Sequence, residues 1–129
     1  MLVLVKTIEQ ANAIQFHAQG TPILTGKSSA KERRQAVADL QSGTVNAIIA
    51  TTIFDEGVDI PELRKVILAS GGKSQVKLLQ RVGRGLRLAA NKHEVEIIDF
   101  GDHHHKMLRR HAVERIRIWK NEGFEVNEL

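Results

Sequence analysis

The chain has 129 residues, of which 42% are hydrophobic and 26% charged, a composition typical of one globular domain with a packed core. It contains no cysteine, which excludes disulfides and thiolate metal sites and agrees with a reducing cytoplasm, where we expect the protein to act. No apolar run approaches the roughly 20 residues of a membrane span, so we expect no membrane association. The formal net charge is +4, and residues 71–93 hold six basic residues and no acid, a pattern typical either of a surface that binds a polyanion or of a solvated surface.

Short apolar runs alternate with amphipathic stretches along the chain. The apolar runs predict strands at residues 1–5, 22–24, 45–50, 66–69 and 95–100. Helical spacing of apolar residues predicts helices at about 8–18, at 30–40, after Ser74, and at about 108–119. Ser28 or Ser29 would cap the second of these helices, and Ser42-Gly43 would end it.

This alternation predicts an α/β fold. Continuous apolar strands separated by helices favour a three-layer domain, with a mainly parallel sheet between helices on both faces. Ligand sites in such folds lie at the carboxyl ends of the strands. We expect residues 1–129 to form one domain, with 103–129 as a basic C-terminal helix and tail. Because the chain begins inside a predicted strand, we expect it to be a fragment of a longer protein.

The tripeptide Gly-Lys-Ser occurs twice, at residues 26–28 and 72–74. A phosphate-binding P-loop also needs a glycine five residues before the Gly-Lys pair, so that its backbone can wrap around the phosphates. Those positions hold Thr21 and Ile67. Neither tripeptide therefore predicts a P-loop, and the chain has no visible means of holding a nucleotide by itself.

Residues 50–61 follow a predicted strand and therefore lie at a ligand-binding edge. Thr51 and Thr52 offer hydroxyl groups to a phosphate, Gly57 allows close backbone approach, and Asp59 could accept hydrogen bonds from a ribose. On local chemistry alone, an ordinary polar loop explains the same residues.

Residues 80–87 read Gln-Arg-Val-Gly-Arg-Gly-Leu-Arg. Arg84 lies between two glycines, and Arg87 can share its face if the turn is helical. Two guanidinium groups at one point match the charge of a transferring phosphoryl group. The alternative is a pair of surface arginines.

Together these two segments resemble motifs V and VI of the C-terminal motor domain of superfamily 2 helicases. The opening strand with Lys6-Thr7 resembles motif IV, and Thr25-Gly26 with residues 31–33 resembles the segment that follows it. The resemblance extends over residues 2–100, and motifs V and VI are its specific part. Residues 56–61 and the leading Gln80 place the chain nearer the DNA repair and restriction branch than the DEAD-box branch.

The resemblance implies a RecA-like fold and a role for individual residues in nucleotide binding. Arg84 and Arg87 would act as catalytic arginine fingers on the γ-phosphate of ATP, with Gln80 beside them. Gly57 and Asp59 would line the nucleotide cleft.

The same resemblance implies contacts with nucleic acid. Thr7, Thr25, Gly26 and Thr51 would contact the nucleic-acid backbone, as hydroxyl and N–H groups do when they position a strand without reading its sequence. DNA is favoured over RNA.

The family's P-loop and acidic Mg²⁺-binding motif belong to a first motor domain and are not visible in this sequence. The resemblance therefore implies that ATP with Mg²⁺ is bound mainly by an N-terminal RecA-like domain of the same longer chain, and that this chain alone is inactive. An alternative is a non-catalytic nucleic-acid-binding module with the same fold. A Rossmann-like enzyme is disfavoured, because no G-x-G-x-x-G follows a strand.

The C-terminal region raises two further possibilities. His103-His104-His105 with Asp99 and Asp102 has metal-ligating residue types, but consecutive histidines point in different directions, so we predict a solvated helix start and no metal site. The basic helix could flank a nucleic-acid channel or form a solvated face, and Trp119 on its apolar side is expected in the core. The basic residues in question are Arg109, Arg110, Arg115, Arg117 and Lys120.

Overall fold

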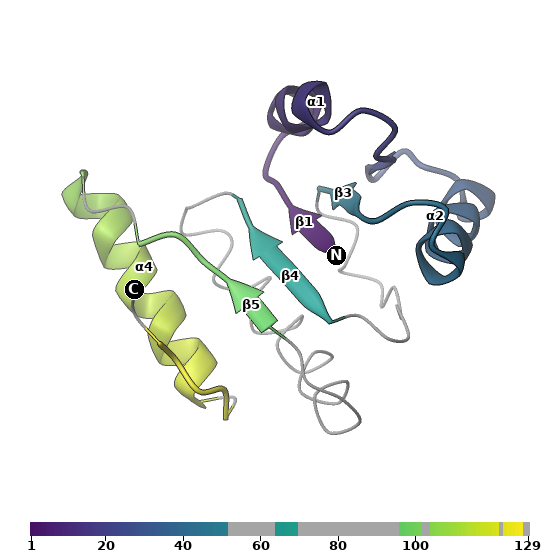
Figure 1. Ribbon diagram of the computed structural model, residues 1–129. Helices are drawn as coiled ribbons and strands as arrows, with labels where there is room; N and C mark the ends of the chain where they lie inside the picture. The colour runs from purple at the N-terminus through teal and green to yellow at the C-terminus, as the bar shows by residue number, and fades with distance from the viewer. Residues whose placement is uncertain (52–63, 70–95, 102–103, 122, 128–129) are drawn as a thin grey trace.

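The computed structural model describes residues 1–51, 64–69, 96–101, 104–121 and 123–127. Their centre is a five-stranded sheet in which every pair of neighbouring strands is parallel, in the order β2-β3-β1-β4-β5 (Figure 1). The strands are β1 (Leu2–Leu4), β2 (Ile23–Leu24), β3 (Ile48–Ala50), β4 (Lys65–Leu68) and β5 (Glu96–Ile98).

Three helices accompany the sheet in the described residues: α1 (Ile8–His17), α2 (Ala30–Ser42) and α4 (Lys106–Asn121). Thr7 caps α1, and Ser29 caps α2 by accepting a hydrogen bond from the Glu32 N–H at 3.1 Å. Gly43 ends α2 with a φ of 80°, a left-handed conformation that glycine adopts without steric cost. No helix among these residues is long and apolar enough to span a membrane.

The sheet is buried on both faces, which explains the continuous apolar strands. Alternate residues of β1 belong to different clusters, because successive side chains of a strand point to opposite faces. Leu2 and Leu4 pack in a cluster with Ala36 of α2 and Trp119 of α4, whereas Val3 packs in a cluster with Ala11 of α1. The domain therefore has three layers, with α2 and α4 on one face and α1 on the other.

The structure confirms the α/β fold, the parallel sheet and all five predicted strands. The third strand is shorter than the predicted 45–50, because the Val45 N–H donates to the Asp39 carbonyl at 3.1 Å in the turn after α2. Between the two serines proposed as cap, Ser29 caps α2, while Ser28 Oγ accepts from the Thr25 N–H at 2.9 Å. The helix predicted after Ser74 lies outside the described residues.

Candidate nucleic-acid interface

The three threonines predicted to contact the nucleic-acid backbone lie near the same edge of the sheet. Because the strands are parallel, their carboxyl ends share that edge, where Thr25 follows β2, Thr51 follows β3 and Thr7 lies three residues beyond β1. The Thr51 N–H donates to the Leu24 carbonyl at 3.1 Å, which holds these two strand ends in register. Since neighbouring strands lie about 4.8 Å apart, the three strand ends form a continuous row, which we call the threonine edge.

Thr7 is exposed and holds the first turn of α1. Its Oγ1 accepts a hydrogen bond from the Gln10 N–H at 3.1 Å, and its backbone is extended, as at other N-caps. The same hydroxyl can still donate its proton, since a hydroxyl is both donor and acceptor. Thr7 can therefore cap the helix and contact a phosphate at the same time.

Gln10 is a structural residue of this edge that the sequence analysis missed. Its Nε2 donates to the Ala69 carbonyl at 2.7 Å, and its Oε1 accepts from the Lys6 N–H at 3.1 Å. These bonds join the start of α1 to the residues that follow β1 and β4. The spacing Thr7-x-x-Gln10 was a usable signal, since a glutamine three residues after a threonine cap is typical of a capping box.

The turn after β2 is ordered by its own hydrogen bonds. Thr25 Oγ1 accepts from the Lys27 N–H at 3.2 Å, and the Thr25 carbonyl accepts from the Ser28 N–H at 3.0 Å. Gly26 is exposed, and a Cβ placed on it would meet no atom within 4 Å. The turn therefore presents a preformed, open surface to a ligand.

Thr51 differs from the other two threonines because only 7% of its surface is exposed. It follows β3, which lies between β2 and β1 in the sheet. A contact between Thr51 and a nucleic-acid backbone stays a prediction. The predicted nucleotide-site residues Gly57, Asp59, Gln80, Arg84 and Arg87 lie outside the described residues.

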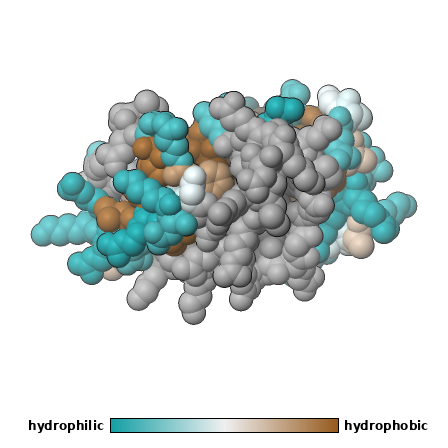
Figure 2. All heavy atoms as spheres, turned by 90° about the horizontal axis from the view of Figure 1, so that it is seen from below, coloured by the Kyte–Doolittle hydropathy of each residue, from teal (hydrophilic) through white to brown (hydrophobic). Residues whose placement is uncertain are grey.

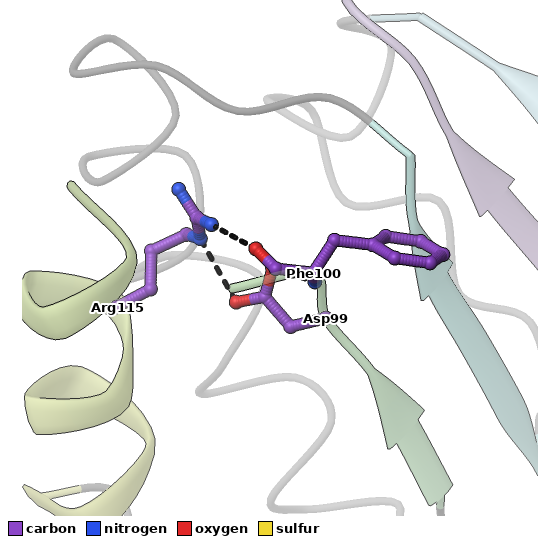
Figure 3. Close-up of polar contacts among 3 residues, drawn as sticks. All are labelled: Asp99, Phe100 and Arg115. Carbon is purple, nitrogen blue, oxygen red and sulfur yellow. Dashed lines mark hydrogen bonds and ion pairs between the residues drawn. The ribbon is translucent and has the colours of Figure 1, made fainter. Parts of the chain in front are cut away.

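The carboxyl end of β5 is tied to α4 by Arg115 (Figure 3). Arg115 Nε donates to Asp99 Oδ2 at 2.8 Å and Nη2 donates to the Phe100 carbonyl at 3.1 Å, while Nη1 is buried and has no hydrogen-bond partner in the described part of the chain. The Arg115 side chain is 1% exposed. The expectation that Arg115 belongs to the exposed basic face is therefore wrong: the residue points inward, because Asp99 offers it a partner there.

Asp99, one of the residues of the possible metal site, uses both of its carboxylate oxygens in hydrogen bonds within the protein. One carboxylate oxygen of Asp99 accepts from Arg115, and the other accepts from the Phe100 N–H at 2.8 Å. His105 Nδ1 accepts from the Met107 N–H at 3.2 Å at the start of α4. Within the ranges that the structure describes, no group of three His, Asp or Glu side chains is arranged to hold a metal ion.

Residues 1–89 match the model of the helicase conserved C-terminal domain. The chain belongs to this family. It is 34% identical over 99 residues to a protein named helicase 22 of the Sulfolobus islandicus filamentous virus, covering 77% of this chain and 18% of the relative. It is 33% identical over 90 residues to the DNA 3'-5' translocase XPB2 of Sulfurisphaera tokodaii, covering 69% of this chain and 20% of the relative.

The fold of this helicase C-terminal domain agrees with a solved structure. The C-terminal domain of the DEAD-box protein Dbp5 matches with a TM-score of 0.65 at 23% identity, over 95% of this chain and 69% of that one. The sequence relatives, among them the XPB2 translocase and an ATP-dependent DNA helicase MPH1 of Coccidioides immitis, place the chain in the DNA repair and restriction branch of superfamily 2. The chain spans about a fifth of the length of its first relatives.

Proposed function

We propose that this chain is the second motor domain of an ATP-dependent helicase or translocase that acts on nucleic acid, with DNA favoured over RNA. The observation that carries the proposal is the match of residues 1–89 to the helicase C-terminal domain, together with the exposed residues Thr7 and Gly26 of the threonine edge. The names of relatives such as the DNA 3'-5' translocase XPB2 support DNA.

In this proposal ATP binds between two motor domains of one longer chain. The first domain holds most of the nucleotide and its Mg²⁺, and the present domain completes the site. Arg84 and Arg87 stabilise the charge on the γ-phosphoryl group, while Gly57, Asp59 and Gln80 line the cleft. The arginines lose their target when the phosphate leaves, so the closed arrangement is favoured only while the γ-phosphate is bound.

The threonine edge holds the nucleic-acid strand in this proposal. Thr7, Thr25 and Thr51 supply hydroxyl groups to phosphate oxygens, and Gly26 allows the strand to approach the backbone of the turn. Contacts of this kind fix position without reading base sequence, which suits a motor that moves along any sequence. Closing and opening of the two domains then advances the strand.

A non-catalytic nucleic-acid-binding module is the second candidate. It would use the same threonine edge but would never close on a nucleotide. The two proposals differ at Arg84 and Arg87, which would have no role in the non-catalytic nucleic-acid-binding module.

The isolated chain should hydrolyse ATP at a rate that cannot be distinguished from background, with or without single-stranded DNA. The reason is that its arginines complete a site whose P-loop lies elsewhere. A phosphate-release assay at saturating ATP measures this, with the longer protein as the positive control. Turnover by the purified 129-residue chain that follows its own concentration would contradict the two-domain account.

A further inference from the structure

Helix α4 presents a row of cations that the proposed motor does not use. Lys106, Arg110 and Arg117 fall within about 40° of one another around the helix axis, because an α-helix turns once in about 3.6 residues. Arg109 and Lys120 extend this arc to about 100°. All five side chains are exposed, and we call them the cationic stripe.

The opposite side of α4 is fixed to the domain. Ala112, Ile118 and Trp119 are buried, Trp119 in one cluster with residues of the sheet, and Arg115 pairs with Asp99 at the end of β5. Figure 2 shows hydrophilic side chains projecting from the end of the molecule where α4 lies in Figure 1. The stripe is therefore held rigidly, in one orientation relative to the sheet.

The charge of the stripe is not balanced locally. Glu114 is the acid of α4, and it is half-buried at the margin of the stripe. None of the five cations forms an ion pair with another residue that the structure describes. A solvated face normally mixes both signs, so five unpaired cations in one row favour an extended polyanion.

The form of the stripe favours a duplex over a single strand. From Lys106 to Lys120 the helix rises about 21 Å, which matches the length of about six base pairs. The aromatic residue of α4, Trp119, is buried, so the stripe offers no aromatic side chain on which the bases of a single strand could stack. A stripe that offers charge alone suits the regular, densely charged phosphate rows of a duplex.

We infer that the cationic stripe of α4 binds the phosphate backbone of duplex DNA, on a surface separate from the threonine edge. The threonine edge follows β2, β3 and β1, whereas Arg115 anchors α4 at the carboxyl end of β5, the outer strand beyond β4. The choice of DNA as the polyanion rests on the proposed function. The motor would then hold a single strand at the ends of β2, β3 and β1 and the adjoining duplex along α4.

Fluorescence anisotropy with a short labelled DNA duplex, and with one of its strands alone, tests this inference on the 129-residue chain. The variant Arg110→Gln/Arg117→Gln should weaken duplex binding about tenfold and reduce the slope of log affinity against log salt by about 2, because two phosphate contacts are lost. Its single-strand affinity should stay near that of the unchanged chain.

The matched control is Arg64→Gln/Lys65→Gln, which removes two charges at the amino end of β4 that belong to neither the cationic stripe nor the threonine edge. It should bind duplex like the unchanged chain, and thermal unfolding checks that both variants are folded. Equal loss from both double variants would show a general charge effect and overturn the inference. So would unchanged duplex binding by Arg110→Gln/Arg117→Gln, or a chain that binds no duplex.

A separate variant distinguishes this inference from the proposed function. Gly26→Glu places a negative charge at the open turn of the threonine edge, where a Cβ meets no neighbour within 4 Å. It should weaken single-strand binding and leave duplex binding unchanged. If Gly26→Glu leaves single-strand binding unchanged as well, the threonine edge does not hold the single strand, whereas the inference about the cationic stripe is unaffected. If Gly26→Glu weakens single-strand binding but Arg110→Gln/Arg117→Gln leaves duplex binding unchanged, the proposed function is supported and the inference about the cationic stripe is wrong.

Discussion

Replacing Arg87 with alanine in the longer helicase should lower ATP hydrolysis by about 10³–10⁵-fold, the contribution of an arginine finger in motors that use one. The guanidinium group stabilises charge that develops on the γ-phosphoryl group during transfer, so its loss acts on turnover. Binding of DNA should be largely retained, because in the proposed function the threonine edge, and not Arg87, contacts the nucleic-acid strand. Steady-state phosphate release and a DNA-binding titration measure the two quantities on the same preparation.

Two further variants make this result specific. Arg87→Lys should recover little activity, because lysine keeps the charge but lacks the planar pair of donors. Arg64→Ala, at an exposed residue directly before β4, should hydrolyse ATP normally. Turnover near the wild-type rate in Arg87→Ala would remove the finger assignment and favour the non-catalytic module.

Replacing Arg115 with methionine should lower the free energy of unfolding of the chain by roughly 3 kcal/mol. The substitution leaves Asp99 without its partner, and the Asp99 side chain is only 20% exposed. It also removes the hydrogen bond to the Phe100 carbonyl. Equilibrium unfolding in urea, followed by circular dichroism, measures the loss.

The helix supplies a matched control for this experiment. Arg117 is exposed and two residues further along α4, so Arg117→Met should change the free energy of unfolding by no more than about 0.5 kcal/mol. The double variant Asp99→Asn/Arg115→Met should recover part of the loss, because the unpaired buried charge is gone. If Arg115→Met is as stable as Arg117→Met, the ion pair does not hold α4 to the sheet.

The strands were predictable because both faces of a parallel sheet are buried. Leu2, Val3 and Leu4 are all apolar, and the structure assigns alternate members of this run to opposite layers. The start of β3 was not predictable, since Val45 is as apolar as a strand residue but hydrogen-bonds to Asp39 in the preceding turn. Local composition does not distinguish a valine in a strand from a valine in a turn.

The threonine edge could be placed from the sequence, because each threonine follows a predicted strand and parallel strands end at one edge. The burial of Thr51 could not be predicted, since it depends on tertiary packing that the local sequence does not show. Arg115 was missed because it lies in a basic run and its partner, Asp99, is 16 residues away. The available signal was the position of Arg115 on the apolar side of the helix, seven residues after Leu108 and four before Trp119.

The central claim is that this domain completes an ATP site that another domain begins. The most direct measurement is DNA-stimulated ATP hydrolysis by the longer protein, with this domain present and with it deleted. We predict that deletion abolishes the DNA-stimulated rate while the remaining protein still binds ATP. Stimulated hydrolysis that persists after deletion would contradict the account.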